Sequence, residues 1–463
     1  MNKIRSKDEL LTLLREGEQL LRKEKLSLVL LLSLPAMLGQ LSIIAMQYID
    51  AMMVGRLGAQ ASAAIGVVST STWLFGGICA TLGSGFCVLV AHRVGAEDRD
   101  GARDVLRQAL LLSVGFALVV SALCVAVHPY LPLWLGAEAD VAALASGYFL
   151  VWALTLPVMQ LLYLSNGMLR SSGNMLVPGM LGVLMCLLDV VFNSLFIPRW
   201  GVTGAALATS LAGGSVAFSS LAYLLFRSKD LKLWHHPGHL RLDSRIIRKS
   251  LNISAPMMLE HAIFCAAQIA STIIVADLGT VAIAANAFGI VVESLCYMPG
   301  YGIGEAATTL IGQSYGARRG DLIRSFSRLT IVLGVAVMSL LGVVMYVFAP
   351  ELMAYMTPDT AVQEQSVIAL RIEAFAEPMY AASIIVYSIF VGLGDTKIPS
   401  IMNLCTIWLV RIPLAYVLSR SMGFPGVWVA MAVELTVRGV IFLVRMRLKR
   451  IDQIQFSNQI ESK

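Results

Sequence analysis

The sequence has 463 residues, of which 57% are hydrophobic and only 14% are charged, and its mean hydropathy is +0.76. A soluble domain carries about a quarter charged residues, so this composition excludes an ordinary soluble protein and indicates an integral membrane protein. The net charge of +6 comes from basic loops between apolar segments and therefore predicts no nucleic-acid partner.

Residues 1–25 precede the first apolar segment and alternate basic with acidic side chains. Their stretch "KDELLTLLREGEQLLRKEKL" repeats Leu at helical spacing, which predicts either an amphipathic helix lying on a surface or a solvated arm. The apolar segment that follows is too long for the core of a signal peptide. We therefore expect no cleaved signal, with the first helix acting as the targeting segment.

Apolar segments then follow one another along the whole chain. A hydrocarbon core of about 30 Å is crossed by about 20 helical residues. We therefore predict an all-α integral membrane protein with twelve transmembrane helices at 27–54, 62–91, 108–130, 142–164, 176–198, 203–226, 252–277, 282–313, 328–349, 367–391, 398–419 and 425–446.

The loops between these segments differ in charge on the two sides. The N-terminal arm, the loop after the second helix, the central linker, the loop after the eighth helix and the C-terminal tail are rich in Lys and Arg, whereas residues 131–141 and 350–366 contain neither. Basic loops stay on the cytoplasmic side. The sequence thus predicts a multi-pass protein of the cell inner membrane with both termini in the cytoplasm.

The sequence contains an internal repeat, in which the second half matches the first. Aligning Pro35 with Pro256 gives an offset of 256 minus 35, or 221 residues. Positions paired at this offset include Leu57-Gly58 with Leu278-Gly279, Gly83 with Gly304, Gly95-Ala96 with Gly316-Ala317, Pro157 with Pro378, and Pro178 with Pro399. After one inserted residue, Gly201 and Gly204 match Gly423 and Gly426 at offset 222.

This repeat predicts the organisation of the domains. We expect a cytoplasmic arm (1–25), an N-lobe of six helices (26–226), a cytoplasmic linker (227–250), a C-lobe of six helices (251–447) and a cytoplasmic tail (448–463). Six helices return the chain to its starting side, so a pseudo-two-fold axis along the membrane normal would relate the lobes. Such bundles favour alternating access by a monomer; the alternative is that duplication only enlarges a stable bundle.

Asp50 is unusual because it lies in an apolar helix, where a carboxylate costs about 2.5 to 3.5 kcal/mol on insertion scales. Its counterpart in the second half is Ser271, so the repeated fold itself does not need the charge. In "LLDVVFN", Asp189 and Asn193 lie one helical turn apart, and their counterparts are Arg411 and Ala415.

Depth along the helices puts Asp50, Asp189 and Asn193 in the same part of the N-lobe. Two carboxylates close together in a desolvated bundle repel each other, and a bound proton would relieve this repulsion. We predict these residues as a site for the coupling cation. The alternative is a carboxylate that is hydrogen-bonded for structural reasons or faces a wet vestibule.

The second half has its own charged residues. Glu260, Glu305 and Arg411 are candidate contacts for a substrate or an ion, with structural salt bridges as the alternative reading. Proline inside a helix removes a hydrogen bond and permits bending, so Pro35, Pro256 and Pro299 are predicted hinges.

Cofactors, metals and catalysis are not expected. The seven Cys residues lie in apolar segments without partners at ligand spacing, and His235, His236 and His239 stand in a basic loop without acidic or Cys partners. An intramembrane enzyme would need a pattern such as H-E-x-x-H, and His261 after Glu260 lacks the second His.

Five stretches resemble signatures of the multidrug and toxic compound extrusion (MATE) transporter family, across essentially the whole chain. They are "DAMMVGRLGA", "GVTGAALAT", "SAPMMLE", "PGYGIGEAATTLIGQSYGA" and "GLGDTKIP". The resemblance implies a secondary active multidrug efflux antiporter that exports organic cations or other toxic compounds, which are amphipathic or cationic small molecules, in exchange for H+ or Na+.

The resemblance also implies roles for particular residues. Asp50 matches the family's acidic residue in the first helix, and Asp189 and Asn193 match its polar pair in the fifth helix, which together form the cation site of the N-lobe. In the branch coupled to Na+ through the C-lobe, acidic residues occupy the places of Phe264 and Tyr380, so this chain favours H+ at the N-lobe. The alternative function is a lipid-linked precursor flippase or another solute exporter of related architecture.

Overall fold

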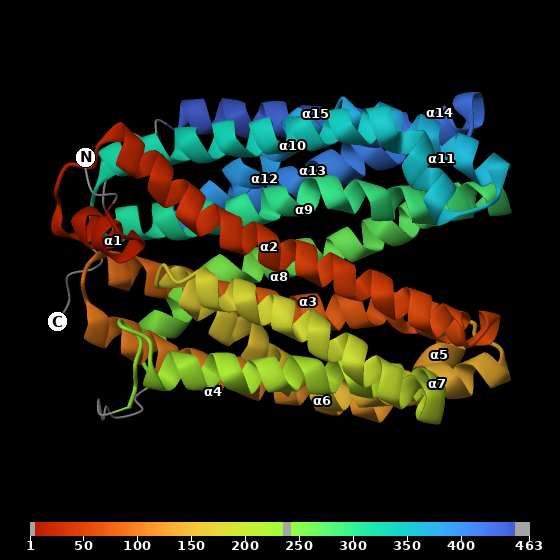
Figure 1. Ribbon diagram of the computed structural model, residues 1–463, viewed down its shortest axis with the longest axis horizontal. Coiled ribbons are helices and arrows are strands. Elements are labelled where there is room, and N and C mark those ends of the chain that lie inside the picture. The colour runs from red at the N-terminus through yellow and green to blue at the C-terminus, as the bar shows by residue number, and fades with distance from the viewer. Residues whose placement is uncertain (1–4, 235–241, 450–463) are drawn as a thin grey trace. The chain divides into compact units, whose positions relative to one another are not determined.

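The computed structural model describes residues 5–234 and 242–449, and these residues form helices without any strand (Figure 1). The helices of the first half are α1 (Lys7–Glu16), α2 (Arg22–Gly55), α3 (Ala59–Gly95), α4 (Arg99–Val127), α5 (Leu131–Trp134), α6 (Ala139–Ser171) and α7 (Leu176–Phe226). Those of the second half are α8 (Ser244–Ala276), α9 (Thr280–Gly316), α10 (Gly320–Met356), α11 (Thr360–Ala374), α12 (Glu377–Gly392), α13 (Lys397–Thr406), the π-helical turn η1 (Ile407–Arg411), α14 (Ile412–Met422) and α15 (Phe424–Leu448).

The number of membrane spans agrees with the prediction. Within the described residues, ten helical segments are long and apolar enough to cross a membrane, and α11 with α12 makes an eleventh if the bent pair is one span. The 51 residues of α7 cover two predicted spans, 176–198 and 203–226. Dividing α7 at its kink therefore gives twelve spans, and the predicted fold class is confirmed.

The kink in α7 lies at Gly201, whose φ of 55° and ψ of −130° are not helical. Gly423, its partner in the repeat, separates α14 from α15 with φ 65° and ψ −142°. A side chain is strained at such positive φ values, which explains glycine at both places. The repeated glycines thus mark the same tight connection in each half.

The predicted span at 367–391 is broken. It consists of α11 and α12, which meet at 58°. Pro378 lies in the first turn of α12 and α11 ends at Ala374, four residues earlier. A proline ring clashes with the carbonyl of the fourth residue before it, which accounts for the end of α11. In the first half, α6 continues through the paired Pro157.

The described chain divides into two compact units. Unit 1 contains the chain up to Met37, Gly95–Glu97, and the chain from Ala262 onward, while unit 2 contains Leu38–Val94 and Asp98–His261. The chain passes from one unit to the other within α2 after Met37 and within α8 after His261.

The N-terminal arm forms a helix that packs against protein. Ser6 and Glu9 form a capping box at the start of α1, and Leu10 and Leu14 are fully buried. In unit 1, Arg15 donates to the side chain of Gln313 in α9 at 3.3 Å. Of the two alternatives for this segment, the amphipathic helix is the one that forms, and its apolar face is covered by protein.

Candidate functional site

In unit 2, apolar packing sets α2 against α7. Val54 of α2 and Ile197 of α7 belong to one buried cluster with Phe149 of α6. Each of the two aliphatic residues follows a polar one by four positions, since Val54 comes one turn after Asp50 and Ile197 one turn after Asn193. Burying such side chains stabilises the fold by about 1.5–3 kcal/mol each, and the shared cluster brings the two polar residues into the same part of unit 2.

Asn193 connects the two predicted carboxylates. Its side-chain nitrogen donates to Oδ1 of Asp50 at 2.6 Å and to Oδ2 of Asp189 at 2.7 Å. Asp189 and Asn193 are fully buried, whereas Asp50 is half-buried. The structure thus brings the three predicted residues of the first half together, with Asp50 the most accessible of them.

The charges of this cluster are not balanced by a basic side chain. Among the described residues, no Lys or Arg forms an ion pair with Asp50 or Asp189. Oδ1 of Asp189 and Oδ1 of Asn193 are buried without a hydrogen-bond partner in the described structure. Carboxylate and amide oxygens accept protons or hard cations, so the cluster has the chemistry to bind either.

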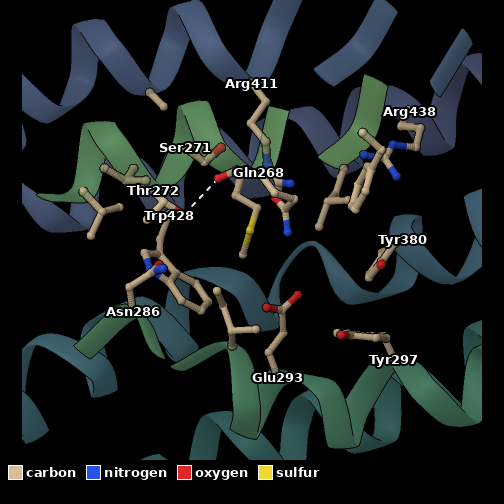
Figure 2. Close-up of a pocket in the computed structure, with 17 residues that line it drawn as sticks. Gln268, Ser271, Thr272, Asn286, Glu293, Tyr297, Tyr380, Arg411, Trp428 and Arg438 are labelled. Carbon is tan, nitrogen blue, oxygen red and sulfur yellow. Dashed lines mark hydrogen bonds between the residues drawn. The ribbon is translucent and has the colours of Figure 1, made fainter. Parts of the chain in front are cut away.

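In unit 1, a cavity of about 140 Å³ lies between α8, α9, α12 and the segment from η1 to α15 (Figure 2). Its lining includes Arg411 from η1, Glu293 from α9 and Trp428 from α15. Phe264 and Tyr380, the residues at the places of the family's C-lobe acids, also line it. A π-helical turn adds one residue to a helical turn, and such turns are frequent at functional sites. Arg411 is the last residue of η1, so this turn sets the direction of its side chain.

Two arginines of this region share one carboxylate. Arg438 donates to both oxygens of the fully buried Glu434 at 2.8 Å. Arg411 lies 3.8 Å from the same carboxylate, which is an ion pair but not a hydrogen bond. Glu434 is therefore engaged by Arg438, and the guanidinium of Arg411 remains available to the cavity.

Three further glutamates surround the break between α11 and α12. Glu373 lies in the last turn of α11, Glu377 begins α12, and Glu293 of α9 interacts electrostatically with both. Glu373 and Glu377 are fully buried, and none of their carboxylate oxygens has a hydrogen-bond partner among the described residues. Of these three acids, only Glu293 lines the cavity.

The other predicted residues lie elsewhere. Glu305 is in α9 but does not line the cavity, and Glu260 belongs to unit 2. Pro35, Pro256 and Pro299 lie inside α2, α8 and α9, each of which is a continuous helix.

Glu293 and Trp428 were not predicted as site residues. The repeat distinguishes Glu293, because its counterpart in the first half is the neutral Thr72. The counterpart of Trp428 is the small residue Ala206.

No group of three or more His, Cys, Asp or Glu side chains among the described residues is arranged to hold a metal ion. The sequence prediction for His235, His236 and His239 concerns residues outside the described part.

Comparison with known proteins gives a consistent assignment. The family model MatE matches residues 35–195 and again residues 256–417. The two matches begin at Pro35 and Pro256, the prolines that define the internal repeat. The duplication seen in the sequence is therefore a duplication of one family unit.

Similar proteins extend over nearly the whole chain. The probable multidrug resistance protein NorM of Thermotoga maritima is 24% identical and covers 92% of each chain. The protein of the same name from Brucella suis biovar 1 is 29% identical over 89% of this chain and 91% of its own.

A crystal structure of the Vibrio cholerae MATE transporter VcmN in the bent form shares the fold. Its TM-score is 0.83 at 22% identity, covering 92% of this chain and 97% of that one. Since the family model matches well over half of the sequence, the chain belongs to the MatE family, whose members are transporters and not enzymes.

Proposed function

We propose that this protein is a secondary active multidrug efflux antiporter that exports organic cations or other toxic compounds in exchange for H+, by alternating access. The observation that carries this proposal is the Asp50–Asn193–Asp189 cluster, which has two acids and no basic partner among the described residues. Uncompensated carboxylates inside a membrane are costly and mark ion pathways. The names of the relatives support multidrug substrates.

The cluster is connected to a bending point through α2. Pro35 lies two residues before the place where α2 leaves unit 1, and Asp50 lies on the same helix in unit 2. Fifteen residues of helix correspond to about 22 Å. Proton binding at Asp50 changes its hydrogen bond with Asn193, and the bend at Pro35 transmits this change along α2, with Pro256 and Pro299 as further hinges.

The remaining parts of the proposal follow from the sequence. The protein acts as a monomer in the cell inner membrane, surrounded by lipid, with both termini in the cytoplasm because the basic loops belong there. It uses no cofactor. Na+ is the alternative coupling ion, since the oxygen donors of the cluster also suit a hard cation.

A lipid-linked precursor flippase is the alternative function. Transport of an anionic lipid would require several basic residues along the pathway. The acidic cluster of unit 2 argues against this requirement, because it would repel a pyrophosphate group. We therefore prefer drug efflux.

The test uses purified full-length protein reconstituted in liposomes that contain a fluorescent organic cation. Release of the cation is followed under an imposed pH gradient, an imposed Na+ gradient, or neither. The variants are Asp50→Asn and Asp189→Asn, with Asp277→Asn as a control, because Asp277 is an exposed carboxylate beyond the end of α8.

The proposal expects the pH gradient alone to drive release, and expects this release to be lost in Asp50→Asn and kept in Asp277→Asn. If release requires the Na+ gradient, the coupling ion is Na+ and not H+. Release that survives Asp50→Asn would overturn the role of Asp50 and direct the search to Glu260 and Glu305.

A further inference from the structure

The cavity of unit 1 occupies the place in the second half that the acidic cluster occupies in the first. Ser271, Arg411 and Ala415 all line this cavity. In the repeat, their counterparts are Asp50, Asp189 and Asn193. Both halves therefore carry their polar centre at equivalent positions, but a guanidinium replaces a carboxylate.

One wall of the cavity offers hydrogen-bond donors that lack acceptors. Arg411 makes no hydrogen bond to any described residue, and its ion pair with Glu434 is long at 3.8 Å. Trp428 borders this wall with a side chain that is only 1% exposed, so it contributes shape and Arg411 contributes the charge. A buried donor without an acceptor costs free energy, so this wall is complementary to an anionic group.

The opposite wall is acidic and aromatic. Glu293 is 5% exposed and makes no ion pair with Arg411, although the two side chains point toward each other across the cavity (Figure 2). Next to Glu293, the rings of Tyr297 and Tyr380 lie 5.7 Å apart. A carboxylate beside aromatic faces is complementary to an ammonium group.

The size of the cavity limits what it holds. Pockets for drug-sized ligands measure about 300–1,000 Å³. The enclosed part of this cavity, about 140 Å³, matches a head group of a few atoms.

We propose that this cavity binds the zwitterionic head group of a substrate, with its ammonium group at Glu293 and the two tyrosines, and its acidic group at Arg411. The inference deepens the proposed efflux function, because it adds zwitterions with closely spaced charges to the substrates. A structural salt bridge does not explain the arrangement, because Arg411 and Glu293 face each other without meeting and Glu434 is already engaged by Arg438.

The experiment measures equilibrium binding to the purified full-length protein in detergent, so it does not depend on any gradient. Three probes carry the same dansyl fluorophore: Nε-dansyl-lysine is a zwitterion, dansylcadaverine is a cation and dansylglycine is an anion. Fluorescence in protein-free micelles is subtracted. Wild-type protein is expected to bind the zwitterion at least about ten-fold more tightly than either other probe, because only the zwitterion satisfies both walls.

Single variants test the contribution of each wall to binding separately. Arg411→Gln should weaken binding of the zwitterion about ten-fold or more and leave the cation unaffected, whereas Glu293→Gln should weaken the zwitterion and the cation but not the anion. The control is Arg371→Gln, which changes an exposed arginine of α11.

Equal binding of all three probes by wild type would overturn the inference, and so would variants that weaken all three probes alike. If Arg411→Gln does not fold, Glu293→Gln still decides the question through its different effects on the cation and the anion. Asp50→Asn should keep the zwitterion preference, so loss of proton coupling and loss of this site are separate results.

Discussion

Asn193 holds Asp50 at 2.6 Å through the same side-chain nitrogen that it uses for Asp189 at 2.7 Å. Two acids from different helices therefore depend on a single amide donor. The amide nitrogen has two hydrogens, and both are used. One remaining oxygen of Asp189 and that of Asn193 accept no hydrogen bond from the described residues, which is the feature on which the proposed cation site rests.

Replacing Asn193 by Leu should destabilise the protein. The change keeps the volume but removes both donors, so each acid loses a partner worth about 1.5–3 kcal/mol. Thermal unfolding in detergent measures the loss. Ser194→Ala is the control, and a loss no larger than that of the control would contradict this account.

Replacing Pro35 by Ala should stabilise the protein while slowing transport. Proline inside a helix costs about 3 kcal/mol, so Ala allows α2 to regain a regular hydrogen bond and become stiffer. Unfolding temperature and initial release from liposomes are the two measurements. Pro350→Ala serves as the control, because this proline lies inside α10, which does not pass between the units. It should stabilise without slowing release; slowing by both variants would argue against a special role for Pro35.

Gly302 is predicted to be essential for the packing of α9 against α2 in unit 1. A Cβ atom at this position would lie 2.6 Å from the backbone nitrogen of Met37 and 2.7 Å from its Cα. Backbone atoms cannot yield as a side chain would, so Gly302→Ala should cost about 1–3 kcal/mol. Gly115→Ala in α4 meets no atom within 4 Å and should stabilise by up to about 1 kcal/mol. Unfolding in detergent compares them, and similar effects would disprove this packing argument.

The sequence predicted those features that depend on composition and on the repeat. Apolar length located the membrane helices, and the paired Gly201 and Gly423 marked equivalent connections, both with positive φ. Asp50 was identifiable because the repeat supplies a neutral counterpart. Its depth, calculated from helical rise, was enough to associate it with Asn193.

The sequence could not predict which second-half charges meet. Glu293 and Arg411 are 118 residues apart, and their opposition across the cavity depends on the rotation of α9 and on the extra residue of η1. The break after Ala374 was equally hidden, because the paired Pro157 lies in an unbroken helix. A proline thus permits a break, and the surrounding packing decides whether one forms.

The buried ion pair of α15 gives a last prediction. Glu434 accepts two hydrogen bonds from Arg438 at 2.8 Å and is fully buried. Glu434→Gln removes the negative charge from between Arg438 and Arg411, so two guanidinium groups are left to repel each other. Removing one partner of a buried pair costs about 3–5 kcal/mol, which should appear as a large fall in unfolding temperature.

The control for this change is an exposed pair. Asp104 and Arg107 lie 2.6 Å apart in α4, and 54% of the Asp104 side chain is exposed. Asp104→Asn should therefore cost less than about 1 kcal/mol, because solvent screens the interaction. The double variant Glu434→Gln with Arg438→Met should recover much of the stability, since it also removes a buried charge. If the double variant is as unstable as the single one, the cost arises from Arg411 and not from the pair.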